Sequence, residues 1–133
     1  MTLNINPQSE AAKAASSISR RNHDMELTTD QIRTINDTLR KSLCAQTLNG
    51  TRGKLLLTSG VCAYPPDAVA RLLKEVSQFD KFTPDNDPHE EHDMAAIHLF
   101  GQKFYFKFSY YDSKYEFYGH DIHTLVVMLA EEY

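Results

Sequence analysis

The sequence predicts one small α+β domain in which helices pack on a mainly antiparallel sheet. The chain has 133 residues, close to the commonest domain size, and 41% of them are hydrophobic, which is enough for one core. Its periodic segments follow the order helix, strand, helix, strand, strand, helix. They lie in residues 25–133, which we expect to form the domain. Residues 1–24 are rich in Ala, Ser and Asn, so we expect a flexible N-terminal arm.

Three helices are expected. Residues 27–43 place apolar side chains at helical spacing after a threonine that can cap the first turn. Residues 64–79 show the same spacing, with Pro66 in the first turn, where its missing N–H costs nothing. Residues 121–133 are rich in apolar side chains, and we expect a short closing helix that packs on the sheet.

Three strands are expected. Residues 54–60 form a nearly continuous apolar run, typical of a buried strand. Residues 95–100 and 103–111 flank Gly101-Gln102, which predicts a two-residue hairpin turn. Alternation in the last strand places Phe104, Phe106, Phe108 and Tyr110 on one face, and Tyr105, Lys107, Ser109 and Tyr111 on the other.

The cysteines and the lack of long apolar runs predict a cytoplasmic protein that does not enter a membrane. No run approaches the roughly 20 apolar residues that span a bilayer, and the first residues lack the apolar core of a secretory signal. Cys44 and Cys62 stand in neither a Cys-x-x-Cys nor a His-spaced pattern. Two such cysteines indicate buried, reduced thiols.

The segment FTPDNDPHEEHD, residues 82–93, is the most distinctive part of the chain, and we call it the acidic loop. From Lys81 to Asp93 there are five acids and one base, so the net charge of this segment is −4, the same as that of the whole chain. A negative field of this kind disfavours nucleic-acid backbones and favours cations or basic protein surfaces. We therefore expect a basic protein partner and no direct nucleic-acid binding.

Three interpretations of the acidic loop stay open. Carboxylates and imidazoles of Asp87, His89, His92 and Asp93 suit a transition metal such as Zn, or an acid–base site, although their spacing matches no established metal motif. Alternatively, Asp and Asn side chains bond to the loop's own backbone while its prolines stiffen it. The third interpretation is a docking surface for a basic partner. No nucleophile motif or phosphate-binding glycine loop is visible, which favours a non-enzymatic protein.

The tyrosine-bearing face of the strand over residues 103–111 suggests a further possibility. Tyr105, Lys107 and Tyr111 have the composition of a platform on which single-stranded nucleic acid stacks. Such platforms lie in basic surroundings, whereas the surroundings expected here are acidic. We therefore expect the tyrosines to cover the sheet or to contact a protein partner instead.

Four blocks of the sequence resemble a known family. The blocks LLLTSGV, FDKFTPDNDPHEEHD, FYFKFSYYD and VVMLAEEY are similar to those of domain-of-unknown-function family 3768, over about Leu27 to Tyr133. The family consists of small bacterial proteins, often encoded on plasmids and mobile elements. Its activity is not established, so the resemblance implies no catalytic residue. It implies that Asp85–Asp93 is the central motif, in which Glu90 stands where the family usually has a glycine.

The leading hypothesis is a non-enzymatic acidic binding protein. By analogy with small acidic proteins of mobile elements, it would inhibit a host defence (of the anti-CRISPR or anti-restriction type) or a nucleic-acid-processing complex by occupying a basic channel. The expected partner-binding residues are Asp85, Asp87, Glu90, Glu91, Asp93, Tyr105 and Tyr111. No cofactor is expected under this hypothesis. The alternative is a small metal-dependent or acid–base enzyme that uses Asp87, His89, His92 and Asp93. Both a monomer and a homodimer stay open.

Overall fold

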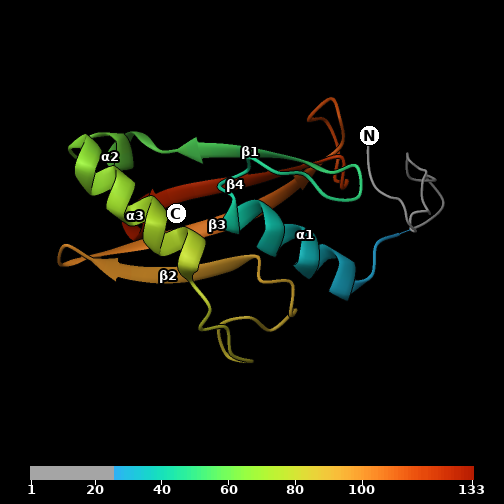
Figure 1. The fold of residues 1–133 in the computed structure, drawn as a ribbon, viewed down its shortest axis with the longest axis horizontal. Coiled ribbons are helices and arrows are strands. Elements are labelled where there is room, and N and C mark those ends of the chain that lie inside the picture. The colour runs from blue at the N-terminus through green and yellow to red at the C-terminus, as the bar shows by residue number, and fades with distance from the viewer. Residues whose placement is uncertain (1–25) are drawn as a thin grey trace.

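A computed structural model of the protein describes residues 26–133 and confirms the α+β fold (Figure 1). The proposed arm over residues 1–24 lies outside the described residues. The helical elements are α1 (Thr29–Lys41), α2 (Ser59–Cys62), α3 (Pro66–Gln78) and the final 3₁₀ turn η2 (Ala130–Glu132). The strands are β1 (Arg52–Leu57), β2 (Met94–Leu99), β3 (Gln102–Tyr111) and β4 (Ile122–Leu129). None of the described helices is long and apolar enough to cross a membrane.

The four strands form one sheet in the order β1-β4-β3-β2. β2 and β3 form an antiparallel hairpin, β3 pairs antiparallel with β4, and β4 pairs parallel with β1. Both α1 and α3 lie on the same face of this sheet (Figure 1). The acidic loop connects α3 to β2, so it emerges beside the helices.

The prediction of a closing helix over residues 121–133 is wrong, because residues 122–129 form the strand β4. β4 lies between two other strands, and most of its side chains are buried whichever face they point to. A strand buried on both faces has a continuous apolar sequence, which periodicity alone does not distinguish from a buried helix. The β-branched residues Ile122, Thr124, Val126 and Val127 favour the strand.

Two local expectations also need correction. The hairpin turn consists of Phe100 and Gly101, one residue earlier than expected, with φ of 56° and 71°. Two consecutive left-handed residues are what a type I′ turn requires. Cys62 is exposed rather than buried, and Cys44 is only half-buried. The reason at Cys62 is that the single helical turn α2 buries Val61 instead.

The core lies between the two long helices and the sheet. α1 begins with a capping box, in which Thr28 and Gln31 bond to each other's backbone N–H groups, and it buries Ile35 and Leu39 completely. The helix approaches β1 so closely at Gly53 that an added Cβ would lie 2.6 Å from Leu39. The sheet contributes the following core residues from its helix-bearing face: Phe104, Phe106, Phe108, Leu125 and Val127.

The expected alternation along β3 is confirmed, since Phe104, Phe106 and Phe108 are buried under the helices. Side chains of the other parity point to the opposite side of the sheet, which we call the open face. No described helix of more than one turn covers this face; the η2 turn and Tyr115, from the segment between β3 and β4, reach it at its margins. From the strand register, the open face consists of Arg52, Lys54, Leu56, Met94, Ala96, His98, Lys103, Tyr105, Lys107, Ser109, Tyr111, Ile122, Thr124, Val126 and Met128.

Candidate functional site

The first half of the acidic loop is bonded to itself. The backbone N–H of Thr83 donates to the side-chain oxygen of Asn86 at 2.8 Å, and the Asn86 amide donates to the carbonyl of Lys81 at 3.0 Å. The backbone N–H of Asp87 donates to the carbonyl of Thr83 at 2.8 Å. These bonds form the side-chain-to-backbone turn that the Asp, Asn and Thr content favours.

Asp87 lies inside the loop rather than on its surface. Only 4% of the residue is exposed, and its Oδ1 accepts the backbone N–H of His92 at 3.1 Å. Its Oδ2 lies 3.6 Å from Nε2 of the same histidine. The sequence led us to expect an exposed docking carboxylate at this position, whereas the buried group stabilises the loop from within.

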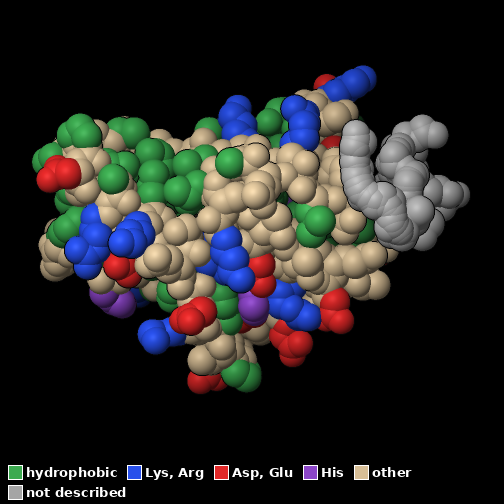
Figure 2. Space-filling view, in the orientation of Figure 1, with side chains coloured by type: hydrophobic (Ala, Val, Ile, Leu, Met, Phe, Trp, Pro, Cys, Tyr) green, Lys and Arg blue, Asp and Glu red, His purple; other side chains and the backbone are tan. Residues whose placement is uncertain are grey.

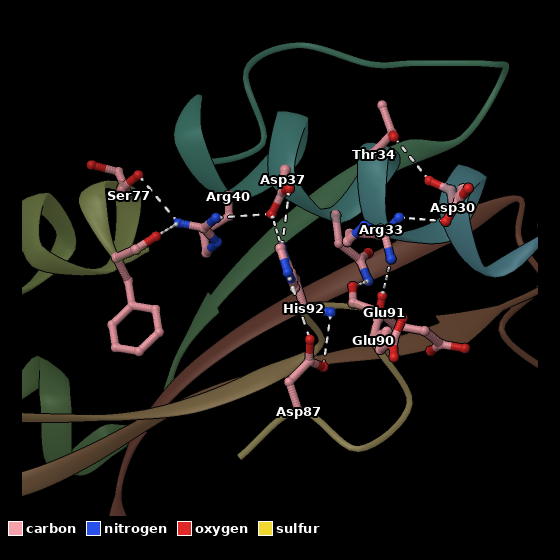
Figure 3. Close-up of polar contacts among 12 residues, drawn as sticks. Asp30, Arg33, Thr34, Asp37, Arg40, Ser77, Asp87, Glu90, Glu91 and His92 are labelled. Carbon is pink, nitrogen blue, oxygen red and sulfur yellow. Dashed lines mark hydrogen bonds and ion pairs between the residues drawn. The ribbon is translucent and has the colours of Figure 1, made fainter. Parts of the chain in front are cut away.

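His92 joins the acidic loop to α1 (Figure 3). Its Nδ1 lies 2.9 Å and 3.1 Å from the two carboxylate oxygens of Asp37, and its ring stacks on Phe82 with 3.9 Å between ring centroids. Both ring nitrogens thus face carboxylates, one from α1 and one from the loop. This arrangement fixes the imidazole in place and leaves neither nitrogen directed at solvent.

Arg40 extends the same cluster to α3. The residue is only 1% exposed, and it donates to Asp37 at 2.9 Å and to the carbonyls of Val76 and Phe79 at 3.1 Å and 2.8 Å. Its guanidinium also lies 5.4 Å from the ring centroid of Phe82. One buried cation therefore binds α1, the end of α3 and the start of the acidic loop together (Figure 3).

A second polar network begins at Glu91 and centres on the buried Asn36. The Asn36 amide donates to the backbone carbonyl of Glu91 at 3.0 Å and to the Tyr110 hydroxyl at 2.9 Å. That hydroxyl donates to the Glu91 carboxylate at 2.8 Å. Burial raises the pKa of Tyr110, and the neighbouring Glu91 carboxylate raises it further, so the hydroxyl keeps its proton at neutral pH.

The Asn36 network continues into two histidines that the sequence placed at the end of the chain. The side-chain oxygen of Asn36 lies 2.7 Å from Nδ1 of His123, and Nε2 of that histidine lies 2.8 Å from Nδ1 of His120. His123 is completely buried. The two histidines are therefore connected to the acidic loop through Asn36 and Tyr110.

The residues of the metal alternative are only partly brought together. Asp87 and His92 are neighbours, while His89 is exposed on the loop surface. In the described part of the chain, no group of three or more His, Cys, Asp or Glu side chains is arranged to hold a metal ion. The polar side chains around His92 instead form ion pairs and hydrogen bonds with one another.

The expected partner-binding residues fall into two separate groups. Asp85 and Glu90 are exposed on the acidic loop, and Glu91 and Asp93 are half-buried. Acidic side chains lie along the lower margin of the helix-bearing face in Figure 2, where this loop lies. A hollow of about 350 Å³ beside them is lined by Arg33, Phe82, Thr83, Pro84, Asp87, Glu90 and His92. Tyr105 and Tyr111, in contrast, lie on the open face and do not join the loop.

Glu90 has the backbone conformation that a glycine adopts most easily. Its φ is 59°, in the left-handed region, and His92 is also left-handed at 53°. According to the family resemblance, most members have a glycine where this chain has Glu90. The left-handed φ explains that preference, because glycine adopts it without a steric penalty. Arg33 donates to the backbone carbonyl of Glu90 at 2.8 Å, so α1 supports this turn through a main-chain group.

Sequence reasoning missed the α1 half of the site. Asn36 and Asp37 lie 55 residues before the loop residues that they bind, and Arg40 lies 36 residues before Val76, whose carbonyl it binds, so only folding brings these groups together. One signal was present. Asn36 and Arg40 follow Ile32 at intervals of four, on the same stripe as the buried apolar residues. Polar side chains on a buried stripe need partners from elsewhere in the fold.

A family model described as "Protein of unknown function (DUF3768)" matches residues 57–132. The chain belongs to this family. The segment shared with DUF3768 contains the acidic loop, α3 and the strands β2, β3 and β4, whereas α1 precedes it. No curated protein and no solved structure showed significant similarity to the chain.

Proposed function

We propose that this DUF3768 protein is a non-enzymatic binding protein that docks its acidic loop on a basic protein surface. The observation that supports this best is the anchoring of the loop. His92 is fixed between Asp37 and Asp87, while Asp85 and Glu90 stay exposed. The partner class that fits is a nucleic-acid channel in a host-defence or nucleic-acid-processing complex, which the protein would inhibit by occupying it.

An anchored loop lowers the entropic cost of binding. Ordering a mobile loop upon association costs free energy for each side chain and backbone segment that becomes fixed. Here the turn is already held by Asp87, Asn86 and the contacts to α1. Exposed carboxylates on such a turn can replace phosphates opposite Lys and Arg side chains, and they also accelerate association with a basic surface.

The test is affinity capture from a bacterial lysate with the wild-type protein and an Asp85→Lys/Glu90→Lys variant. We expect the wild type to capture a basic or nucleic-acid-binding protein, and the variant to capture at least about tenfold less of it. Added salt should lower the amount captured by the wild type in the same way. A Glu116→Lys/Glu131→Lys variant is the matched control, because it reverses two exposed acids outside the loop. Equal capture by all three proteins would sink the proposal.

A metal-dependent or acid–base enzyme is the second candidate, because Asp87 and His92 line the hollow beside the loop. The residues would be Asp87, His89, His92 and Asp93, with a transition metal such as Zn. Elemental analysis of protein purified without chelator, next to a His89→Ala/His92→Ala variant, separates the two candidates. About one metal ion per chain, lost in the variant, would favour the enzyme over the docking loop.

A further inference from the structure

The open face of the sheet is basic although the protein is acidic. Four cations lie among its strand residues: Arg52, Lys54, Lys103 and Lys107. None of the strand residues on this face is Asp or Glu, although acids outnumber Lys and Arg by 18 to 14 in the whole chain. The strands of the open face therefore carry positive charge only, while the acidic loop lies on the helix-bearing side of the sheet.

The strand register sets out these side chains in rows. Lys54 pairs with Thr124, which pairs with Ser109, and the next row along the sheet contains Leu56, Val126, Lys107 and Met94. Lys103 lies six residues along β3 from Ser109, which corresponds to about 20 Å. The cations therefore extend along the whole strip, with Arg52 and Lys54 at one end, Lys107 in the middle row and Lys103 at the other end.

Tyrosines accompany each lysine on this face. The ammonium nitrogen of Lys103 lies 5.2 Å from the ring centroid of Tyr105, and that of Lys107 lies 5.7 Å from the ring of Tyr133. At the other end, Lys54 lies 5.4 Å from the ring of Tyr115. Tyr133 and Tyr115 are 67% and 46% exposed, so ring surface and positive charge are both accessible.

The aromatic rings form two groups at opposite ends of the strip. Tyr105 and Tyr133 have ring centroids 5.5 Å apart, and Tyr111 and Tyr115 have centroids 5.6 Å apart. Between them lies Thr124, a buried residue whose hydroxyl oxygen has no hydrogen-bond partner among the described residues. A ligand that lies along the strip passes over two aromatic groups and four cations.

The acids nearest to the open face lie at its margin. Glu132 is the closest in sequence to Tyr133, but its carboxylate accepts bonds from Thr58, the Gly60 N–H and the Leu129 N–H. Glu131, Asp112 and Glu116 lie on the flanking segments rather than on the strands. Asp112 accepts backbone N–H bonds within its own turn.

We propose that the open face binds a short stretch of single-stranded nucleic acid. A single strand supplies phosphates for the lysines and unstacked bases for the tyrosines, and such stacking tolerates any base sequence. An acidic peptide would match the charge but would offer no rings to stack on the exposed tyrosines. A duplex hides its bases. This proposal goes beyond the docking of the acidic loop and does not depend on it.

The sequence-based expectation against nucleic-acid binding depended on acidic surroundings for Tyr105, Lys107 and Tyr111. In the structure these residues lie on the opposite side of the sheet from the acidic loop, among lysines. The open face therefore has the basic surroundings that nucleic-acid binding requires, and the reason for expecting no such binding does not apply to it.

Fluorescence anisotropy with a short labelled oligonucleotide of mixed sequence, in DNA and RNA forms, tests the proposal at low and moderate salt. We expect Tyr105→Leu to weaken binding by about 5- to 150-fold, since one base no longer stacks, while Tyr105→Phe retains most of the affinity. A Lys103→Ala/Lys107→Ala variant should bind more weakly and show a salt slope smaller by about 0.7 for each phosphate that the variant no longer neutralises. The control is Lys74→Ala/Lys81→Ala, which removes two exposed lysines that lie outside the open face.

Competition identifies the ligand class. An unlabelled single strand should displace the labelled one more effectively than a duplex of the same sequence or polyglutamate of equal charge. Displacement by polyglutamate as effective as by the single strand would overturn the proposal in favour of an acidic protein partner. Binding that is absent at low salt, or that weakens equally in the Lys74/Lys81 control, would overturn it as well.

Discussion

Nδ1 of His92 lies 2.9 Å from Oδ1 of Asp37, and this contact joins two segments 55 residues apart in the sequence. It links the acidic loop to the middle of α1, and Asp37 in turn binds the buried Arg40. The most distinctive segment of the sequence is thus fixed by polar side chains of a helix that precedes it by about 55 residues. The anchoring and the exposure of the neighbouring acids are separate properties, and they can be tested separately.

Replacing Asp87 with Ala should lower the free energy of unfolding by about 1–3 kcal/mol. The substitution leaves the backbone N–H of His92 and the imidazole without their buried acceptor. Urea unfolding followed by circular dichroism measures the change. The matched control is Asp85→Ala in the same loop, where the carboxylate is exposed and the expected change is within about 0.5 kcal/mol. Equal stabilities for the two variants would show that Asp87 does not anchor the loop.

Replacing Arg40 with Met should destabilise the protein more strongly, by about 3–5 kcal/mol. The change leaves Asp37 without its buried cation and the carbonyls of Val76 and Phe79 without their donor. The neighbouring Lys41→Met is the control, because Lys41 is exposed on the same helical turn. Thermal unfolding of both variants under the same conditions is sufficient. A loss below about 1 kcal/mol for the Arg40 variant would contradict the assigned role.

Replacing Glu90 with Gly should stabilise the protein by about 1 kcal/mol, although it removes a side chain. The reason is the φ of 59°, which costs a residue with a Cβ about 1–2 kcal/mol and costs glycine little. Glu90→Ala separates this backbone effect from the loss of charge, since alanine keeps the Cβ and should give no such gain. If the Glu90→Ala variant were instead more stable than the wild type, relief of charge repulsion within the loop would explain the gain.

The sequence was informative where one element determines its own environment. The amphipathic α1 and α3 and the alternating β3 follow from periodicity, because each buries one side of itself. β4 was mistaken for a helix because its neighbours β1 and β3 bury both of its faces, and pairing with β1 brings together residues about 70 positions apart. No local pattern contains that information.

The same distinction holds for the candidate site. The crowding of Asp and His in the loop was visible in the sequence, and so was the possibility of bonds to its own backbone, which Asn86 and Asp87 make. The sequence could not show which carboxylate becomes buried, because that depends on Asp37 and Arg40 from α1. Nor could it show that Tyr105 and the loop lie on opposite sides of the sheet, since this follows from the direction in which β2 leaves the loop.

Raising the pH should destabilise the protein from about pH 9 upward. Burial raises the pKa of the Cys44 thiol from 9.0 to about 11, and burial also raises the pKa of Tyr110 above its usual value of 10.0. A group whose pKa is raised by folding stabilises the fold fully below its unfolded pKa, and this stabilisation is lost as the pH rises toward the folded pKa. Urea unfolding at several values between pH 8 and pH 11 measures the loss.

Cys44→Ala should make stability less dependent on pH between about pH 9 and pH 11, because it removes the thiol that titrates in this range. Cys62→Ala provides the comparison, since the Cys62 side chain is exposed and should leave the profile unchanged. Alkylation at neutral pH gives an independent readout. Cys62 should react first, because the half-buried Cys44 thiol stays protonated and the thiolate is the reactive form. Faster modification of Cys44 in the folded protein would contradict the raised pKa and, with it, the predicted alkaline destabilisation.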